Sequence, residues 1–113
     1  MTPAQFDKAC LALPGATMDV QWGDDHVYKV GGKMFAATGS AGTSFSFKAS
    51  DIAFEALTQG GRGRPAPYLA RARWVWFPDM AELDAAEVAD WLKTAHGLVA
   101  ARLTRKQRVE LGL

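Results

Sequence analysis

The sequence has little cysteine and no long apolar run, and these two shortages exclude several classes of protein. Its single cysteine, Cys10, cannot form an internal disulfide, which fits a reducing cytoplasm. No apolar run approaches the roughly 20 residues that a membrane helix needs, and no signal-peptide pattern opens the chain. We therefore expect a cytoplasmic protein without a membrane-spanning segment.

Motifs that hold metals or nucleotides are missing as well. No HxxxH, CxxC or HExxH spacing occurs, and the Gly-rich segments 30–33 and 60–63 match neither phosphate-loop pattern. His26 and His96 are far apart in sequence, and Cys10 lies on the apolar stripe of a predicted helix. We expect no catalytic residue, metal or cofactor, and hence no enzyme. A pocket that placed His26 or His96 beside a carboxylate would instead favour a small-ligand enzyme.

What the chain does contain is typical of one small globular domain spanning residues 1–113. Apolar residues make up 49% and charged residues 22% of its 113 residues, so it can build a single core. The net charge of +1 hides alternating blocks, because residues 62–78 hold four arginines and no acid, whereas residues 79–90 hold five acids and no base. A local field of this kind, more than net charge, steers a polyanion toward a protein.

Caps, turns and hydrophobic periods predict an α+β fold. Thr2, Pro3 and Gln5 are typical of a helix start, and apolar residues at every second position indicate strands further on. Gly97, inside the last helix, predicts a close approach to another backbone. The predicted elements are a helix over about 3–13, strands over 17–22, 26–30, 33–38 and 43–48 joined by turns that include 39–42, a helix over 51–58, a strand over 73–77 and a long helix from residue 84, with a basic tail over 104–113.

The window Arg62–Phe77 combines arginine, proline and aromatic residues, and we interpret it as the candidate functional segment. Its prolines predict irregular backbone before residue 73, which leaves 73–77 as its only strand. We expect Trp74 and Trp76 to face the core under the long helix. Tyr68 is interpreted as a packing plug, with an exposed stacking surface as the alternative.

Seven basic residues form the candidate binding set. They lie on hairpin ends and on the neighbouring loop, where they could converge on one face and contact phosphates. A solvated rim is the simpler interpretation from composition alone. The set consists of Lys29, Lys33, Lys48, Arg62, Arg64, Arg71 and Arg73.

Weak motifs are spread along the chain on Trp22, Lys29, Gly32, Lys33, Phe35, Lys48, Pro67, Tyr68 and Trp74. Together with the segment Leu13-Pro14-Gly15-Ala16, their order and spacing resemble those of the MmcQ/YjbR family of small bacterial proteins. The resemblance covers essentially the whole chain. Two departures stand out: the loop 60–67 is unusually rich in glycine and arginine, and Ala70-Arg71 replaces an Asn-Lys that is common in the family.

The resemblance implies a two-layer α+β sandwich of the type α-β(3)-α-β(2)-α, with helices on one face of an antiparallel sheet. The fold is similar to that of secretion chaperones. It also implies a double-wing arrangement and DNA binding, a role inferred for the family from structure. We therefore expect a non-enzymatic protein that contacts the DNA backbone. The alternative is a protein- or peptide-interaction module that binds a protein partner or a second copy of itself.

Overall fold

The computed structural model describes residues 1–21, 23–39 and 43–113, so Trp22 and most of the predicted turn at 39–42 lie outside the described residues. Each predicted helix and strand is present, and the basic tail forms a separate short helix. The elements are α1 (Pro3–Leu11), β1 (Ala16–Gln21), β2 (Asp25–Val30), β3 (Lys33–Thr38), β4 (Phe45–Lys48), α2 (Asp51–Gln59), β5 (Arg64–Pro65), the 3-10 helix η1 (Ala70–Ala72), β6 (Trp74–Phe77), α3 (Ala85–Ala100) and α4 (Arg105–Glu110).

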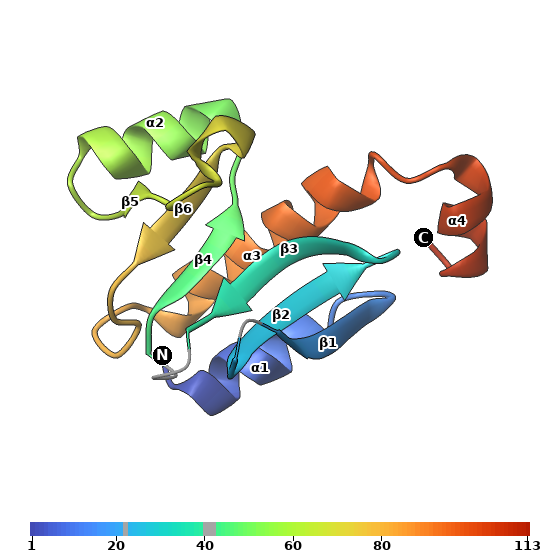
Figure 1. Ribbon diagram of the computed structural model, residues 1–113, viewed down its shortest axis with the longest axis horizontal. Helices are drawn as coiled ribbons and strands as arrows, with labels where there is room; N and C mark the ends of the chain where they lie inside the picture. The colour runs from blue at the N-terminus through green and yellow to red at the C-terminus, as the bar shows by residue number, and fades with distance from the viewer. Residues whose placement is uncertain (22, 40–42) are drawn as a thin grey trace.

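The strands form one antiparallel sheet in the order β1-β2-β3-β4-β6-β5. Four strands precede α2, as the residue pattern predicts, which is one more than the resemblance implies. A β-bulge interrupts the β2–β3 pairing: Tyr28 pairs with Ala36 and Lys29 with Met34, which leaves Phe35 as the extra residue. Bulges bend a strand locally, and β3 is visibly curved in Figure 1.

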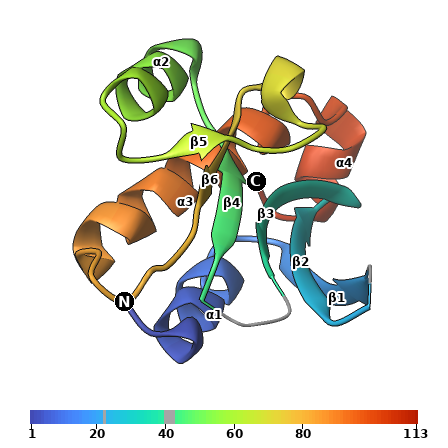
Figure 2. The same ribbon diagram turned by 60° about the vertical axis from the view of Figure 1, so that its left-hand side comes forward.

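Helices cover one face of this sheet and leave the other largely open. In Figure 1, α1 and α3 run behind the strands, and Figure 2 shows α1, α2 and α3 on the same side. Among the described residues, the opposite face is crossed by the loop between β5 and β6. The predicted two-layer α+β sandwich is therefore confirmed.

The core lies between the sheet and α3, where aromatic rings stack. Phe45 and Phe77 are cross-strand partners with ring centroids 5.1 Å apart, and Trp91 of α3 stacks on Phe47 at 5.4 Å and on Phe77 at 5.2 Å. Stacking of this kind adds to the stabilisation from apolar burial. The predicted helix stripe is buried as expected: Val88, Leu92, Ala95, Val99 and Leu103.

The strand β6 presents the opposite face to the core from the one predicted. Val75 and Phe77 point toward α3, whereas Trp74 and Trp76 lie on the open side of the sheet. Both faces of β6 carry large apolar residues, so alternation alone could not choose between them. Trp74 is nevertheless buried, because the loop between β5 and β6 folds back and exchanges backbone hydrogen bonds with it.

Two further expectations were wrong. Residues 62–78 hold a second strand, β5, which includes Pro65 and pairs with β6 at the sheet edge. An edge position tolerates proline because no ladder hydrogen bond is needed on its outer side.

Gly97 is exposed, and a Cβ built there would meet nothing within 4 Å, so no backbone packs closely against it.

Cys10 is buried in α1 against the core, as its position on the apolar stripe predicts. Burial, with a smaller contribution from the charge of Asp7, raises the pKa of the Cys10 thiol well above its usual range. We expect a thiol reagent at pH 8 to label the native protein at least about 100-fold more slowly than a denatured sample, because the thiolate is the reactive form. Equal labelling rates in native buffer and in urea would contradict this burial.

Candidate functional site

Three of the seven predicted basic residues are engaged by carboxylates. Lys29 pairs with Asp19 across β1 and β2, with Nζ 3.0 Å from Oδ2. Arg62 donates two hydrogen bonds to Glu87 of α3, at 2.6 and 3.2 Å, and these bonds lower the pKa of that carboxyl. A cation that is already paired with a carboxylate attracts a phosphate less strongly than an unpaired one.

Arg73 is the third engaged residue. Its Nε lies 3.0 Å from Oδ1 of Asp51 at the start of α2, and its guanidinium lies over the ring of Phe54. Arg73 also closes η1 in a left-handed conformation, with φ of 62°. Arg62 and Arg73 therefore pair with α3 and α2 respectively, and the arginines of the window 62–78 do not act as one group.

Four further cations come from β4, β5, η1 and the segment after α3, and we call them the basic edge. Arg64 pairs with Trp76 in register and its guanidinium lies over the Trp76 ring, 6.0 Å from the centroid. Arg71 is exposed on η1. Among the described residues, neither arginine has a carboxylate within 4.0 Å. The basic edge consists of Lys48, Arg64, Arg71 and Arg102.

Lys48 links the basic edge to the loop behind it. Its ammonium donates a hydrogen bond to the carbonyl of Ala72. Burial lowers the pKa of Lys48, and the positive charges of Arg102 and Arg73 lower it further, whereas the carboxylate of Asp51 opposes this shift. Arg102, which follows α3, was not in the predicted set, because its proximity to Lys48 depends on how α3 crosses the sheet. Lys33 is exposed beside the turn between β2 and β3.

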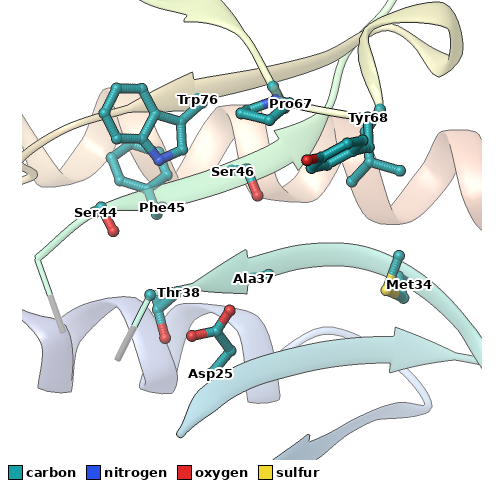
Figure 3. A pocket seen from close by; sticks show the side chains of 13 residues that line it. Asp25, Met34, Ala37, Thr38, Ser44, Phe45, Ser46, Pro67, Tyr68 and Trp76 are labelled. Carbon is teal, nitrogen blue, oxygen red and sulfur yellow. The ribbon is translucent and has the colours of Figure 1, made fainter. Parts of the chain in front are cut away.

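Beside the basic edge, the open face is hollowed into a groove of about 550 Å³. Figure 3 shows Trp76, Pro67 and Tyr68 along one wall, Ser44 and Ser46 of the β4 segment on the floor, and Asp25 and Met34 on the facing side. Ser44, Ser46 and Lys48 alternate with the buried Phe45 and Phe47, so strand periodicity alone indicated that they share a face. The full lining is Asp25, Met34, Ala37, Thr38, Gly39, Ser44, Phe45, Ser46, Ala66, Pro67, Tyr68, Leu69 and Trp76.

Tyr68 is fully exposed, so the expectation of a packing plug was wrong. The amide of Leu69 donates to the carbonyl of Ala66 at 3.1 Å, which closes a four-residue turn with Pro67 and Tyr68 in the middle. Tyr68 has φ of 65°, and a proline followed by a positive φ is the pattern of a type II turn. This turn directs the ring outward, beside the groove, instead of into the core.

A second hollow, of about 420 Å³, brings His26 near two carboxylates, Asp7 and Asp24. Asp7 is already engaged, because it accepts a 2.8 Å hydrogen bond from the Tyr28 hydroxyl. Within the described part of the chain, His26 makes no hydrogen bond to either carboxylate. The other histidine, His96, is buried with Nε2 2.7 Å from the carbonyl of Pro14.

Two other features, a metal-binding cluster and a membrane-spanning helix, are absent from residues 1–21, 23–39 and 43–113. No cluster of three or more His, Cys, Asp or Glu side chains there could hold a metal ion. The same ranges contain no helix whose length and apolar character would let it cross a membrane. The groove and the basic edge beside it are therefore the best-formed candidate site.

Comparisons with known proteins agree with the fold and the predicted family. A family model, YjbR, matches residues 11–98. A crystal structure of a Deinococcus radiodurans protein that carries the DUF419 family-model domain is similar, with a TM-score of 0.86 and 25% identity, over 99% of this chain and 88% of that chain. No curated protein matches. Because the family model matches most of the length of this chain, the chain belongs to the YjbR family.

Proposed function

We propose that this protein binds nucleic acid, without acting on it as an enzyme, through the basic edge of its open sheet face. The observation that carries the proposal is the position of Arg64 over the ring of Trp76, on the groove wall that also holds Tyr68, with Lys48 and Arg102 near each other as further cations. A cationic surface of this kind attracts phosphates, and adjacent aromatic rings offer stacking surfaces for bases. We place this activity in the cytoplasm, because a single cysteine without an internal disulfide partner suits a reducing compartment.

The proposal narrows the predicted site. Lys29, Arg62 and Arg73 are balanced by carboxylates, so we assign them to structure, and Lys33 belongs to the turn between β2 and β3. The acids Asp19 and Asp25 belong to the β1–β2 side, and Asp51, which lies near Lys48, is paired with Arg73. Phosphates are therefore expected along β4, β6 and η1, and not across the whole sheet.

Salt dependence tests the proposal. If the four cations of the basic edge each neutralise one phosphate, a plot of log K against log salt for a single strand should have a slope of about −3. The variant Arg64→Gln/Arg71→Gln removes two of them and should reduce the slope to about −1.5. Fluorescence anisotropy of a labelled oligonucleotide between about 50 and 200 mM salt measures both values.

A matched control removes two cations that pair with carboxylates. Lys29→Gln/Arg62→Gln removes the same net charge, but these side chains face Asp19 and Glu87. Its slope should stay near that of the unmodified protein. No binding at low salt, or an equal change of slope in the two double variants, would contradict a localised phosphate site.

A specific observation favours a second candidate, the protein- or peptide-interaction module. The groove wall and floor include apolar side chains, among them Met34, Pro67 and Leu69, which an extended peptide or a second copy of the chain could cover. Light scattering tests the homodimer directly, since a dimer would have twice the 12.2 kDa chain mass. A monomeric mass at all concentrations, with nuclease-sensitive pull-downs, would rule against this candidate.

A further inference from the structure

The groove has the construction of a binding site that selects flat ligands. Its volume of about 550 Å³ falls inside the range of about 300–1,000 Å³ that is usual for small-molecule sites. Ala37 is buried and Trp76 half-buried, so the floor and one wall are set by the sheet itself. A preformed hollow of this kind can take a ligand with little rearrangement.

Tyr68 occupies a position that folding alone would give to glycine. The third residue of a type II turn needs a positive φ, which glycine adopts without strain and a tyrosine does not. Packing of the side chain does not offset this strain, because the Tyr68 side chain is fully exposed. Strain held at an exposed aromatic residue beside a groove is typical of a ligand contact.

Trp76 supplies a second ring on the same wall. It is half-buried, and Arg64 lies 6.0 Å over its centroid on the same face of the sheet. Figure 3 shows Trp76 and Tyr68 on either side of Pro67 along the wall. Two aromatic rings beside cations form the arrangement that binds successive bases and their phosphates in single-strand binding proteins.

The polar groups of the groove suit the edges of nucleobases. Thr38, Ser44 and Ser46 carry hydroxyls, which donate and accept hydrogen bonds. The carboxylate of Asp25, on the side away from the basic edge, accepts hydrogen bonds from exocyclic amino groups such as that of cytosine. A carboxylate there would repel phosphates, so the charges favour bases in the groove and phosphates outside it.

We propose that the groove holds unpaired bases of a single-stranded nucleic acid whose phosphates lie along the basic edge. This inference rests on the proposed function. A duplex cannot use the groove, because its bases are already stacked and paired, and so it can contact only the cations. The protein should therefore prefer single strands to duplexes.

The experiment compares a labelled 12-nucleotide single strand with a duplex of the same length by fluorescence anisotropy at about 50 mM salt. We expect the single strand to bind at least about tenfold more tightly, since stacking on aromatic side chains adds to phosphate contacts. The variant Tyr68→Gly should weaken single-strand binding by about 5- to 100-fold and change duplex binding by less than about twofold. Trp76→Leu should act in the same direction.

Thermal unfolding controls for folding in these variants. Glycine suits the backbone at position 68, so Tyr68→Gly should unfold at the same temperature as the unmodified protein or at a higher one. Equal affinity for single strand and duplex, or undiminished single-strand binding by a folded Tyr68→Gly variant, would overturn the groove assignment and leave phosphate binding standing. Absence of binding to both would overturn the proposed function as well.

Discussion

Replacing Phe77 with alanine is expected to lower the free energy of unfolding by about 3–5 kcal/mol. Phe77 is 2% exposed, and its ring stacks on Phe45 at 5.1 Å and on Trp91 at 5.2 Å. Truncation would leave a cavity at the contact between sheet and α3, because both partner rings are held by their own elements. Urea unfolding followed by circular dichroism gives the change.

The control for this prediction is Phe77→Leu, which keeps much of the apolar volume. It should cost less than half as much as the alanine variant, since volume-conserving changes are tolerated better. Trp76→Ala, one residue away on the open face, should also cost less, because Trp76 is only half-buried. A loss below about 1 kcal/mol for Phe77→Ala would mean that the aromatic stack is not the centre of the core.

Two glycine-to-alanine changes are expected to have opposite signs. A Cβ at Gly63 would lie 2.6 Å from Cγ1 of Val75 and 3.1 Å from the Phe77 ring, both of which are buried. We expect Gly63→Ala to lower the free energy of unfolding by about 1–3 kcal/mol through overpacking. Gly97→Ala should raise it by about 1 kcal/mol, because an exposed helical position favours alanine.

Coupling to Val75 distinguishes overpacking from other causes. In the double variant Gly63→Ala/Val75→Ala the clashing methyl group of Val75 is gone. The double variant should therefore lose less unfolding free energy than the two single variants together, by about 0.5–3 kcal/mol. Strict additivity would show that the cost at Gly63 does not arise from this contact. A Gly97→Ala variant less stable than the unmodified protein would show that α3 packs more closely there than the structure indicates.

Local signals were sufficient for most of the elements. The side chain of Thr2 accepts from the amide of Gln5, as the predicted capping box requires, and Ser50 caps α2 in the same way. Such caps are contacts between residues three apart, so the sequence contains both partners. At α3 the side chain of Asp84 accepts from the amide of Ala86, whereas Glu87 pairs with Arg62, a partner that no local signal reveals.

The candidate site was harder to predict than the elements, because charge in a sequence window does not reveal its partners. Arg62, Arg64 and Arg73 look alike in sequence, yet Arg62 and Arg73 meet carboxylates of α3 and α2, whereas Arg64 meets the Trp76 ring. In the two ion pairs, the carboxylate lies 22 or more residues from the arginine in sequence. Whether such residues meet in space depends on the packing of the helices against the sheet.

By itself, the sequence determined α1, α2, α3, every strand except β5, the burial of Cys10 and the family, because each depends on local period, caps or motif order. Only the tertiary structure decided that Phe77 and not Trp76 meets α3, that Tyr68 stands free beside a groove, and that Gly63 and not Gly97 is the crowded glycine. Residue pattern states which side chains share a face of an element. Which of two apolar faces is covered is decided by how well the elements pack together.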